Sequence, residues 1–119
     1  MKIFLIGMPG CGKTKIGRIL ATRLKLSFFD LDNEIVRTSG KPITEIFEQE
    51  SEDFCRLLER DQLRKVTHRN PDFVLATGGG APCFHDNMDF MNEMGISVFL
   101  HVPLSQIYEK LTHSGTRSR

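Results

Sequence analysis

Residues 7–14 read GMPGCGKT and fit the pattern GxxxxGK[ST] without a mismatch. An apolar run at residues 3–6 precedes them, and an amphipathic stretch begins at Thr14. A strand, this glycine-rich segment and a helix in succession are typical of a loop that holds nucleotide phosphates. Glycines let the backbone approach phosphate oxygens closely, and N–H groups at the helix start present partial positive charge to them. The alternative, a glycine-rich turn with an unrelated lysine, is disfavoured by these flanks.

Each position of this loop has an expected role in a nucleotide-binding site. The backbone of Gly10, Cys11 and Gly12 would wrap the phosphates, and Lys13 would place a full charge near the β- and γ-phosphates. The Thr14 hydroxyl can ligate Mg²⁺. A helix N-terminus beside a lysine favours the thiolate, so Cys11 could be oxidisable. The favoured alternative for Cys11 is a small residue that fills an unspecified position of the motif.

Short apolar runs alternate with longer amphipathic segments along the chain. The first helix, expected from residue 14 to 26, carries Ile16, Ile19, Leu20 and Leu24 at three- and four-residue spacing, which indicates one apolar face. Alternating strands and helices predict an α/β fold in which helices cover both faces of a parallel sheet. We expect strands at residues 3–6, 27–29, 73–76 and 97–102, and further helices near residues 33–38, 43–47, 51–68, 86–94 and 103–111.

Composition fits one globular domain and limits the classes of function. The chain has 119 residues, 39% of them hydrophobic and 26% charged, so we expect residues 1–119 to form a single domain. Sixteen Lys and Arg residues against fifteen Asp and Glu give a net charge of +1, which argues against a nucleic-acid-binding protein. No stretch approaches the ~20 apolar residues of a membrane span. The apolar start is also shorter than that of a signal peptide, so we expect a cytoplasmic protein with no membrane partner.

Two aspartates follow the second expected strand. The third strand ends in Thr77 and glycines and offers no acid, whereas Asp30 and Asp32 come directly after residues 27–29. The carboxyl ends of neighbouring parallel strands open onto one crevice, and residues i and i+2 of an extended segment point the same way. Two close carboxylates need a cation or a proton donor between them, so Mg²⁺ for Asp30 and an alcohol for Asp32 would serve. An Asp N-cap followed by a solvated Asp at a helix start is the open alternative.

An arginine and a glycine run complete the candidate site. Arg56 lies near the N-terminal end of the helix at residues 51–68, and its guanidinium suits a planar carboxylate through two parallel hydrogen bonds. From spacing alone, a solvated surface charge is the favoured interpretation of Arg56. Gly78, Gly79 and Gly80 at the third strand's end would let the hydroxyls of a ligand approach bare backbone N–H groups. A flexible turn is the alternative for these glycines.

Taken together, these motifs resemble the shikimate kinase family. The resemblance includes the loop at residues 7–14, DLD at 30–32, GKPI leading into EIF at 40–47, Arg56 followed by Glu59, and TGGGA at 77–81. The loop is shared by many NTPases, and the specific part is the combination of the other motifs in this order. The resemblance implies a P-loop NTPase with three α/β/α layers and the strand order 2-3-1-4-5. It also implies that the last strand is absent from this chain.

The resemblance further implies ATP-dependent phosphorylation of the 3-hydroxyl of shikimate, which yields shikimate 3-phosphate and ADP on the route to chorismate and aromatic amino acids. Shikimate, ATP and Mg²⁺ would be the ligands of a monomer. Lys13 would stabilise the transferring phosphoryl group, while Thr14 and, through water, Asp30 would hold the metal. Asp32 would orient or deprotonate the acceptor hydroxyl.

By the same resemblance, Arg56 would bind the substrate carboxylate and Gly78, Gly79 and Gly80 would line the shikimate pocket. The arginine of the family's lid aligns best with Arg119, with Arg117 as the second choice.

The sequence departs from the family pattern in three places. Cys55 precedes Arg56 where the family has phenylalanine, and Phe54 lies one residue further back. This predicts either an altered apolar wall against the substrate ring or a helix start that is shifted by one residue. In addition, Ser51 replaces a glycine. Family members are also longer, so we expect this chain to end within the lid and to be C-terminally incomplete. A gluconate-type or nucleoside-monophosphate-type kinase, or a non-catalytic nucleotide-binding fragment, are the alternative functions.

Overall fold

Four parallel strands form the central sheet of the computed structural model, which describes residues 1–7, 12–78 and 81–100. The strand order is β2-β3-β1-β4. This arrangement confirms the parallel sheet and the first four positions of the expected order. The helix predicted at residues 103–111 lies outside the described residues, as do Arg117 and Arg119. The strands are β1 (Lys2–Ile6), β2 (Ser27–Asp30), β3 (Phe73–Ala76) and β4 (Ile96–Phe99).

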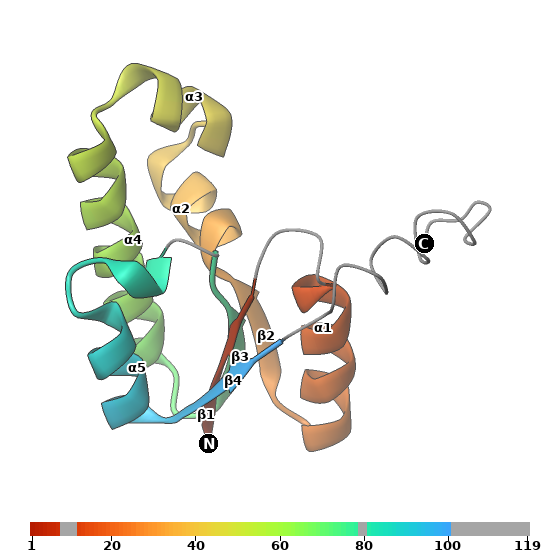
Figure 1. Cartoon of the computed structure of the whole chain (residues 1–119). Coiled ribbons are helices and arrows are strands. Elements are labelled where there is room, and N and C mark those ends of the chain that lie inside the picture. Colours follow the sequence, from red (N-terminus) through yellow and green to blue (C-terminus); the bar gives the residue numbers. More distant parts are fainter. Residues whose placement is uncertain (8–11, 79–80, 101–119) are drawn as a thin grey trace, which may run out of the picture.

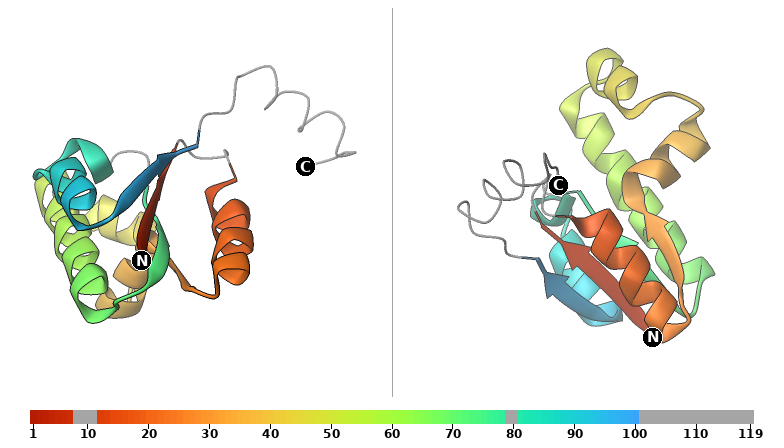
Figure 2. Two further views of the ribbon diagram at one scale, coloured as in Figure 1. Left: turned by 90° about the horizontal axis from the view of Figure 1, so that it is seen from below. Right: turned by 90° about the vertical axis from the view of Figure 1, so that its right-hand side faces the viewer.

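Helices cover both faces of this sheet, which confirms the three-layer α/β/α architecture (Figure 1). Of the described helices, only α1 packs on one face, and α2, α4 and α5 pack on the other, as Figure 2 shows from two further directions. The short helix α3 connects α2 to α4. The bounds are α1 (Lys13–Leu24), α2 (Leu31–Ser39), α3 (Ile43–Gln49), α4 (Glu52–Arg69) and α5 (Asn87–Met94), with a 3₁₀ turn η1 (Ala81–Cys83) before α5.

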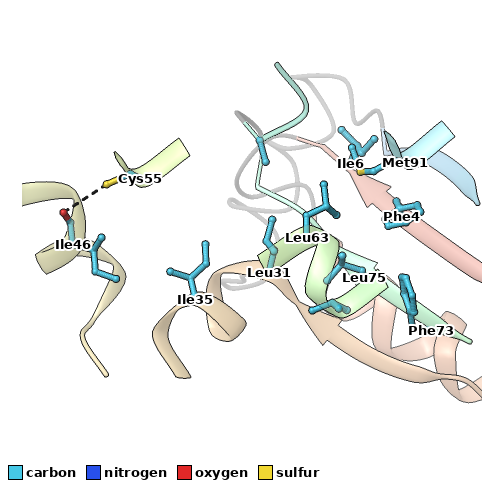
Figure 3. Packing of buried hydrophobic residues seen from close by; sticks show 12 residues of the cluster. Phe4, Ile6, Leu31, Ile35, Ile46, Cys55, Leu63, Phe73, Leu75 and Met91 are labelled. Atoms are coloured by element: carbon cyan, nitrogen blue, oxygen red, sulfur yellow. Dashed lines mark hydrogen bonds between the residues drawn. The ribbon is translucent and has the colours of Figure 1, made fainter. Parts of the chain in front are cut away.

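The strand residues alternate between two apolar clusters, because successive side chains of a strand point to opposite faces. Phe4 and Leu75 belong to the larger cluster, which packs against α2, α4 and α5 (Figure 3). Leu5 and Val74 belong to the smaller cluster, which contains Ala21 of α1. All four of these strand residues are fully buried. Burial on both faces explains why these strands read as continuous apolar runs in the sequence.

Helix α1 contacts the sheet through small residues. The predicted apolar face is wrong for Ile16, Ile19 and Leu24, which are 38%, 47% and 41% exposed. Of that face only Leu20 packs against the smaller cluster, and Gly17 and Ala21 are buried instead. A methyl group on Gly17 would clash with the ring of Phe28 and would lie 3.1 Å from Leu5 Cδ1. The absence of a side chain at Gly17 therefore brings the backbone of α1 close to β1 and β2.

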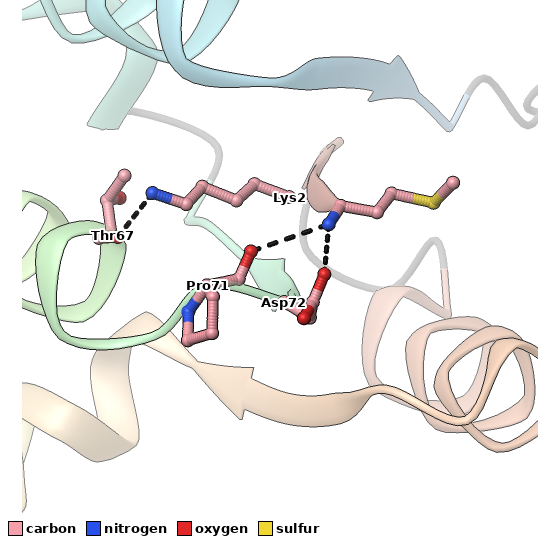
Figure 4. Close-up of polar contacts among 5 residues, drawn as sticks. Lys2, Thr67, Pro71 and Asp72 are labelled. Carbon is pink, nitrogen blue, oxygen red and sulfur yellow. Dashed lines mark hydrogen bonds and ion pairs between the residues drawn. The ribbon is translucent and has the colours of Figure 1, made fainter.

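The amino-terminal edge of the sheet is tied to the end of α4 (Figure 4). Lys2 Nζ donates a 2.8 Å hydrogen bond to the carbonyl oxygen of Thr67, and the amino group of Met1 contacts Asp72. These contacts lie at the opposite end of the strands from the carboxyl edge, where the candidate site residues gather. In the part of the chain that the structure describes, no helix is both long and apolar enough to span a bilayer.

Candidate active site

The glycine-rich loop joins β1 to α1, as the sequence predicts. Gly12 is the N-cap of α1 and has a φ of 84°, a left-handed conformation that glycine adopts without strain. Lys13 begins the helix, and its Nζ donates a hydrogen bond to the carbonyl oxygen of Gly7 at the other end of the loop. The Lys13 side chain therefore links the two ends of the loop. Gly10 and Cys11 lie outside the described residues.

Thr14 and Asp30 face each other at the carboxyl edge of the sheet. Thr14 Oγ1 donates to Asp30 Oδ2 at 3.5 Å, while Asp30 Oδ1 accepts a 3.2 Å hydrogen bond from the backbone N–H of Asn33. Asp30 thus caps α2 with one oxygen and turns the other toward the phosphate loop. The N-cap alternative and the expected orientation toward the loop are both confirmed for Asp30.

These two oxygens suit Mg²⁺, which prefers hard oxygen ligands and usually completes its shell with water and substrate phosphates. Among the described residues there is no group of three or more His, Cys, Asp or Glu side chains that could hold a metal by themselves. A partial set of one hydroxyl and one carboxylate beside a phosphate-binding loop matches the way a nucleotide-bound Mg²⁺ is held.

Asp32 belongs to the first turn of α2, so the prediction of an extended segment at residues 30–32 is wrong. The helix starts at Leu31 because Asp30 caps it, and Leu31 is fully buried as part of the larger apolar cluster. Asp32 nevertheless faces the site: a methyl group on Gly78 would lie 3.9 Å from Asp32 Oδ1 and 3.9 Å from Glu59 Oε2. The carboxylates of α2 and α4 therefore meet beside the end of β3.

The electrostatic surroundings of Asp32 come from both halves of the site. Burial raises the pKa of the Asp32 carboxyl above its ordinary 3.8, and the charge of Asp30 adds to this increase. Lys13 and Arg56 oppose it. One carboxylate is thus influenced by the cation of the phosphate loop and by the cation of α4.

Arg56 is held in place by a buried partner on the same helix. Its Nη1 donates a 2.7 Å hydrogen bond to Glu59 Oε1, and the Arg56 side chain is 18% exposed. The ring centroid of Phe84 lies 4.4 Å from the guanidinium carbon, and that of Phe47 lies 5.8 Å from it. Arg56 Nε is buried and has no hydrogen-bond partner among the described residues. Arg56 is therefore a fixed side chain of the site, and its interpretation as a solvated surface charge is wrong.

Glu59 was named in the family resemblance, but the sequence reasoning gave it no role in the site. It is only 4% exposed, and burial raises its pKa, although the hydrogen bond from Arg56 opposes this increase. Glu59 lies one helical turn after Arg56, which is the usual spacing of an ion pair on a helix. This spacing is the sequence feature from which the Arg56–Glu59 pair could have been predicted. The spacing alone does not distinguish a buried pair from a surface pair.

Cys55 points away from Arg56. Its side chain is buried between α4 and α3, and its Sγ lies 3.6 Å from the carbonyl oxygen of Ile46 (Figure 3). Burial raises the pKa of the Cys55 thiol. The aromatic contacts to Arg56 come from Phe47 and Phe84, so the exchange of phenylalanine for cysteine at position 55 affects the packing of α3.

The glycine segment follows β3 directly. Thr77 is buried, and both its backbone N–H and its Oγ1 donate to the carbonyl oxygen of Leu5, at 3.0 and 3.2 Å. These bonds fix Gly78 beside β1, next to Asp32 and Glu59. Gly79 and Gly80 lie outside the described residues, as does Arg119. The structure thus brings together the site residues that it describes, which are Gly12, Lys13, Thr14, Asp30, Asp32, Arg56 and Gly78.

Comparison with known proteins points to one family. A family model for shikimate kinase matches residues 9–119. A shikimate kinase of Azobacteroides pseudotrichonymphae is 44% identical over 110 residues, which cover 92% of this chain and 65% of that protein. The crystal structure of the Bacteroides thetaiotaomicron shikimate kinase has a TM-score of 0.86 and 39% identity, and the match covers 99% of this chain and 69% of that one. A structure of the Acinetobacter baumannii shikimate kinase in complex with shikimate has a TM-score of 0.84 and 40% identity, with coverage of 98% and 64%.

The chain spans slightly less than two thirds of the length of the bacterial curated relatives it matches, for example 65% of the Azobacteroides protein. Within that span, sequence and fold agree: the family model covers nearly the whole chain, and the solved relatives share its fold at about 40% identity. Thr14, Asp30, Asp32 and Gly78, which belong to the motifs of the resemblance, lie at the carboxyl edge of one sheet. This chain belongs to the shikimate kinase family.

Proposed function

We propose that the chain carries the nucleotide and acceptor sites of a kinase that transfers the γ-phosphoryl group of ATP to the 3-hydroxyl of shikimate. The products are shikimate 3-phosphate and ADP. One observation carries the proposal: the Asp32 carboxylate lies beside Gly78 and Glu59, the partner of Arg56, while Asp30 at the start of the same helix contacts Thr14 of the phosphate loop. The relative from Acinetobacter baumannii, 40% identical to this chain, supports it, because that enzyme was solved in complex with shikimate.

The nucleotide side of the site uses the start of α1. Backbone N–H groups at the helix N-terminus and the Lys13 ammonium bind the phosphates, with Gly10, Cys11 and Gly12 as the expected backbone contacts. Thr14 would hold Mg²⁺ through its hydroxyl, and Asp30 would hold it through a water molecule. When bound, the metal supplies charge neutralisation at the β- and γ-phosphate oxygens.

Asp32 acts on the acceptor hydroxyl. Its carboxylate accepts a hydrogen bond from the acceptor hydroxyl. It then takes up the hydroxyl proton as the phosphoryl group is transferred. The increase in the pKa of Asp32 by burial makes it a stronger base than a solvated aspartate. Lys13 stabilises the charge that develops on the transferring group.

Arg56 binds the shikimate carboxylate. Because Nη1 is occupied by Glu59, the Nε–Nη2 edge offers two parallel donors, and the buried Nε has no partner among the described residues. A carboxylate on this edge would give the buried Nε–H an acceptor and form a bidentate pair. Glu59 and the Phe84 ring hold the guanidinium in the orientation that this pair needs.

Three further assignments stay predictions. Gly78, Gly79 and Gly80 line the shikimate pocket, and Arg119 is the lid arginine that approaches the phosphates, with Arg117 as the second choice. Residues 1–119 belong to a single domain, and this domain is longer in other members of the family. The monomeric state and the cytoplasmic location expected from the sequence also stay predictions.

The test is a coupled assay of ADP release with shikimate, gluconate and AMP as separate acceptors. Of the three acceptors, we expect only shikimate to give ADP release. The Lys13→Ala variant should release no ADP, because phosphate binding and charge stabilisation are both lost. ADP release with gluconate or AMP but not with shikimate would instead indicate one of the other kinase types. Calorimetric binding of a nucleotide together with no ADP release would show a non-catalytic nucleotide-binding chain.

A further inference from the structure

A buried asparagine outside the proposed binding residues connects α4 to the turn that follows the glycine segment. Asn87 is the first residue of α5 and is fully buried. Its Oδ1 accepts a 3.0 Å hydrogen bond from Arg64 Nη1, and its Nδ2 donates a 2.8 Å bond to the carbonyl oxygen of Ala81. A guanidinium only donates and a carbonyl only accepts, so both arms require the same orientation of the amide.

The carbonyl that Asn87 binds is the closing point of the turn η1. Ala81 O also accepts the backbone N–H of Phe84 at 3.3 Å, and the N–H of Ala81 donates to Gly78 O at 3.3 Å. The Asn87 amide therefore joins a set of bonds that runs from Gly78 at the substrate side of the site to Phe84. Phe84 is the residue whose ring covers the Arg56 guanidinium at 4.4 Å.

The turn between Phe84 and Asn87 needs such support. His85 and Asp86 have φ values of 50° and 58°, a left-handed conformation that residues other than glycine rarely adopt. Conformations of this kind persist where the surrounding structure holds them. Arg64 contributes here as well, because its Nη2 donates to the His85 carbonyl oxygen at 3.5 Å and its guanidinium carbon lies 4.4 Å from the Phe90 ring centroid.

We propose that Asn87 is a positioning residue for acceptor binding: by holding Ala81 it fixes the turn that places Phe84 against Arg56. The inference rests on the proposed function for the role of Arg56 as the carboxylate-binding residue. Asn87 does not touch the substrate in this scheme. It acts through the turn, so its loss should misplace Phe84 and loosen the guanidinium while leaving the phosphate loop intact.

The test compares Asn87→Asp with Asn92→Asp, an identical change at an exposed position of the same helix. Aspartate at position 87 still accepts from Arg64 but replaces the donor to Ala81 O with a second acceptor. Two measurements follow the consequence. The first is the NMR resonance of the Arg56 Nε–Hε group, which the Phe84 ring current shifts. The second is calorimetric affinity for shikimate, with ADP as the internal reference.

We expect Asn87→Asp to move the Arg56 resonance and to weaken shikimate binding by about tenfold, because a small misplacement of a binding group costs affinity steeply. ADP affinity should stay within about twofold of the wild-type value, because no contact to the nucleotide changes. Asn92→Asp should change none of these. An unmoved Arg56 resonance, or an equal loss of shikimate and ADP affinity, would overturn the proposal.

Two further measurements keep the inference testable if Asn87→Asp does not fold. Arg64→Met removes the donor that orients the Asn87 amide and should move the Arg56 resonance in the same direction; an unmoved resonance would overturn the proposal. In a double-mutant cycle, Asn87→Asp should add little to the loss caused by Phe84→Leu, because both act on one contact. The Arg56 resonance can be measured without substrate. If the wild-type chain binds no shikimate, the proposed function is refuted, and the resonance still tests whether Asn87 positions Phe84 against Arg56.

Discussion

Replacing Asp32 by asparagine keeps the size of the side chain while removing its charge and its capacity to accept a proton. If Asp32 is the base for the acceptor hydroxyl, turnover should fall by about 10²–10⁴-fold, the usual contribution of a positioned base. That loss corresponds to roughly 3–5 kcal/mol of activation free energy. Nucleotide affinity should change by less than about twofold, because Lys13 and Thr14 keep their positions. ADP release and calorimetric nucleotide binding measure the two effects separately.

The same substitution should change how stability depends on pH. Burial raises the pKa of Asp32 in the folded protein, so the folded state keeps this proton to a higher pH than the unfolded state does. The protonated Asp32 therefore stabilises the folded wild-type protein fully below pH 3.8. This stabilisation is lost as the pH rises through the folded-state pKa of Asp32. The asparagine of the variant has no proton to lose, so Asp32→Asn should be the more stable protein at neutral pH.

The size of this stability difference follows from the same linkage. Each pH unit by which the folded-state pKa exceeds the ordinary value adds about 1.4 kcal/mol at neutral pH. Solvent screening reduces this figure, since Asp32 is half-buried. The charge of Asp32 also raises the pKa of Glu59, so part of the gain arises because Glu59 ionises more easily in the variant. The difference between variant and wild type should shrink toward about pH 4.

Urea unfolding of both proteins at several pH values measures the free energy of unfolding, with unchanged m-values as the check that the same transition is compared. Asp61→Asn is the matched control, because Asp61 is an exposed aspartate of α4 that pairs with Arg60 at the surface. The control should follow the wild-type pH dependence. Turnover of Asp32→Asn close to that of wild type would refute the role as base. A pH dependence identical to wild type would refute the electrostatic reasoning about the crevice.

Two other substitutions test separate parts of the structure. Arg56→Lys should raise the KM for shikimate by about tenfold and leave the KM for ATP unchanged, because an ammonium cannot form the bidentate pair. Steady-state kinetics with each substrate varied in turn measures this, and an unchanged KM for shikimate would remove Arg56 from the binding site. Gly17→Ala should destabilise the protein by about 1–3 kcal/mol, because the new methyl group overpacks the contact with Phe28 and Leu5. A gain in stability in urea unfolding, as expected from helix propensity alone, would show that α1 shifts freely on the sheet.

The sequence predicted best those features that depend on one element and its ends. Strand β3 was expected at residues 73–76 and has the same bounds in the structure, because four buried apolar residues lie between turn residues on both sides. The helix expected from residue 51 begins there, and Ser51 caps α4 by accepting the Phe54 N–H at 3.1 Å. The succession of strand, glycine-rich segment and helix around residues 7–14 was also predicted correctly, since its pattern is local. In each case the residues that decide the structure are neighbours in the chain.

Features that depend on contacts between elements were predicted less well. The apolar spacing of α1 suggested that Ile16 and Ile19 face the sheet, yet Gly17 and Ala21 do so, because close packing on Phe28 requires small residues. Hydrophobic periodicity counts large side chains and misses such a contact. The role of Glu59 in the site was missed for a similar reason: the burial of Glu59 depends on α2 and on the end of β3, which approach α4 only in the folded chain.

The case of Asp30 shows why a local alternative and a functional one need not exclude each other. A carboxylate has two oxygens, and the parallel topology places the end of β2 both before a helix N-terminus and opposite the start of α1. One oxygen of Asp30 satisfies an unpaired N–H of α2, and this bond fixes the direction of the other toward Thr14. The cap therefore contributes to the site, since it fixes in advance a side chain that would otherwise lose rotational freedom on binding a ligand. The same reasoning extends to Asp32, whose place in the first turn of α2 depends on that cap.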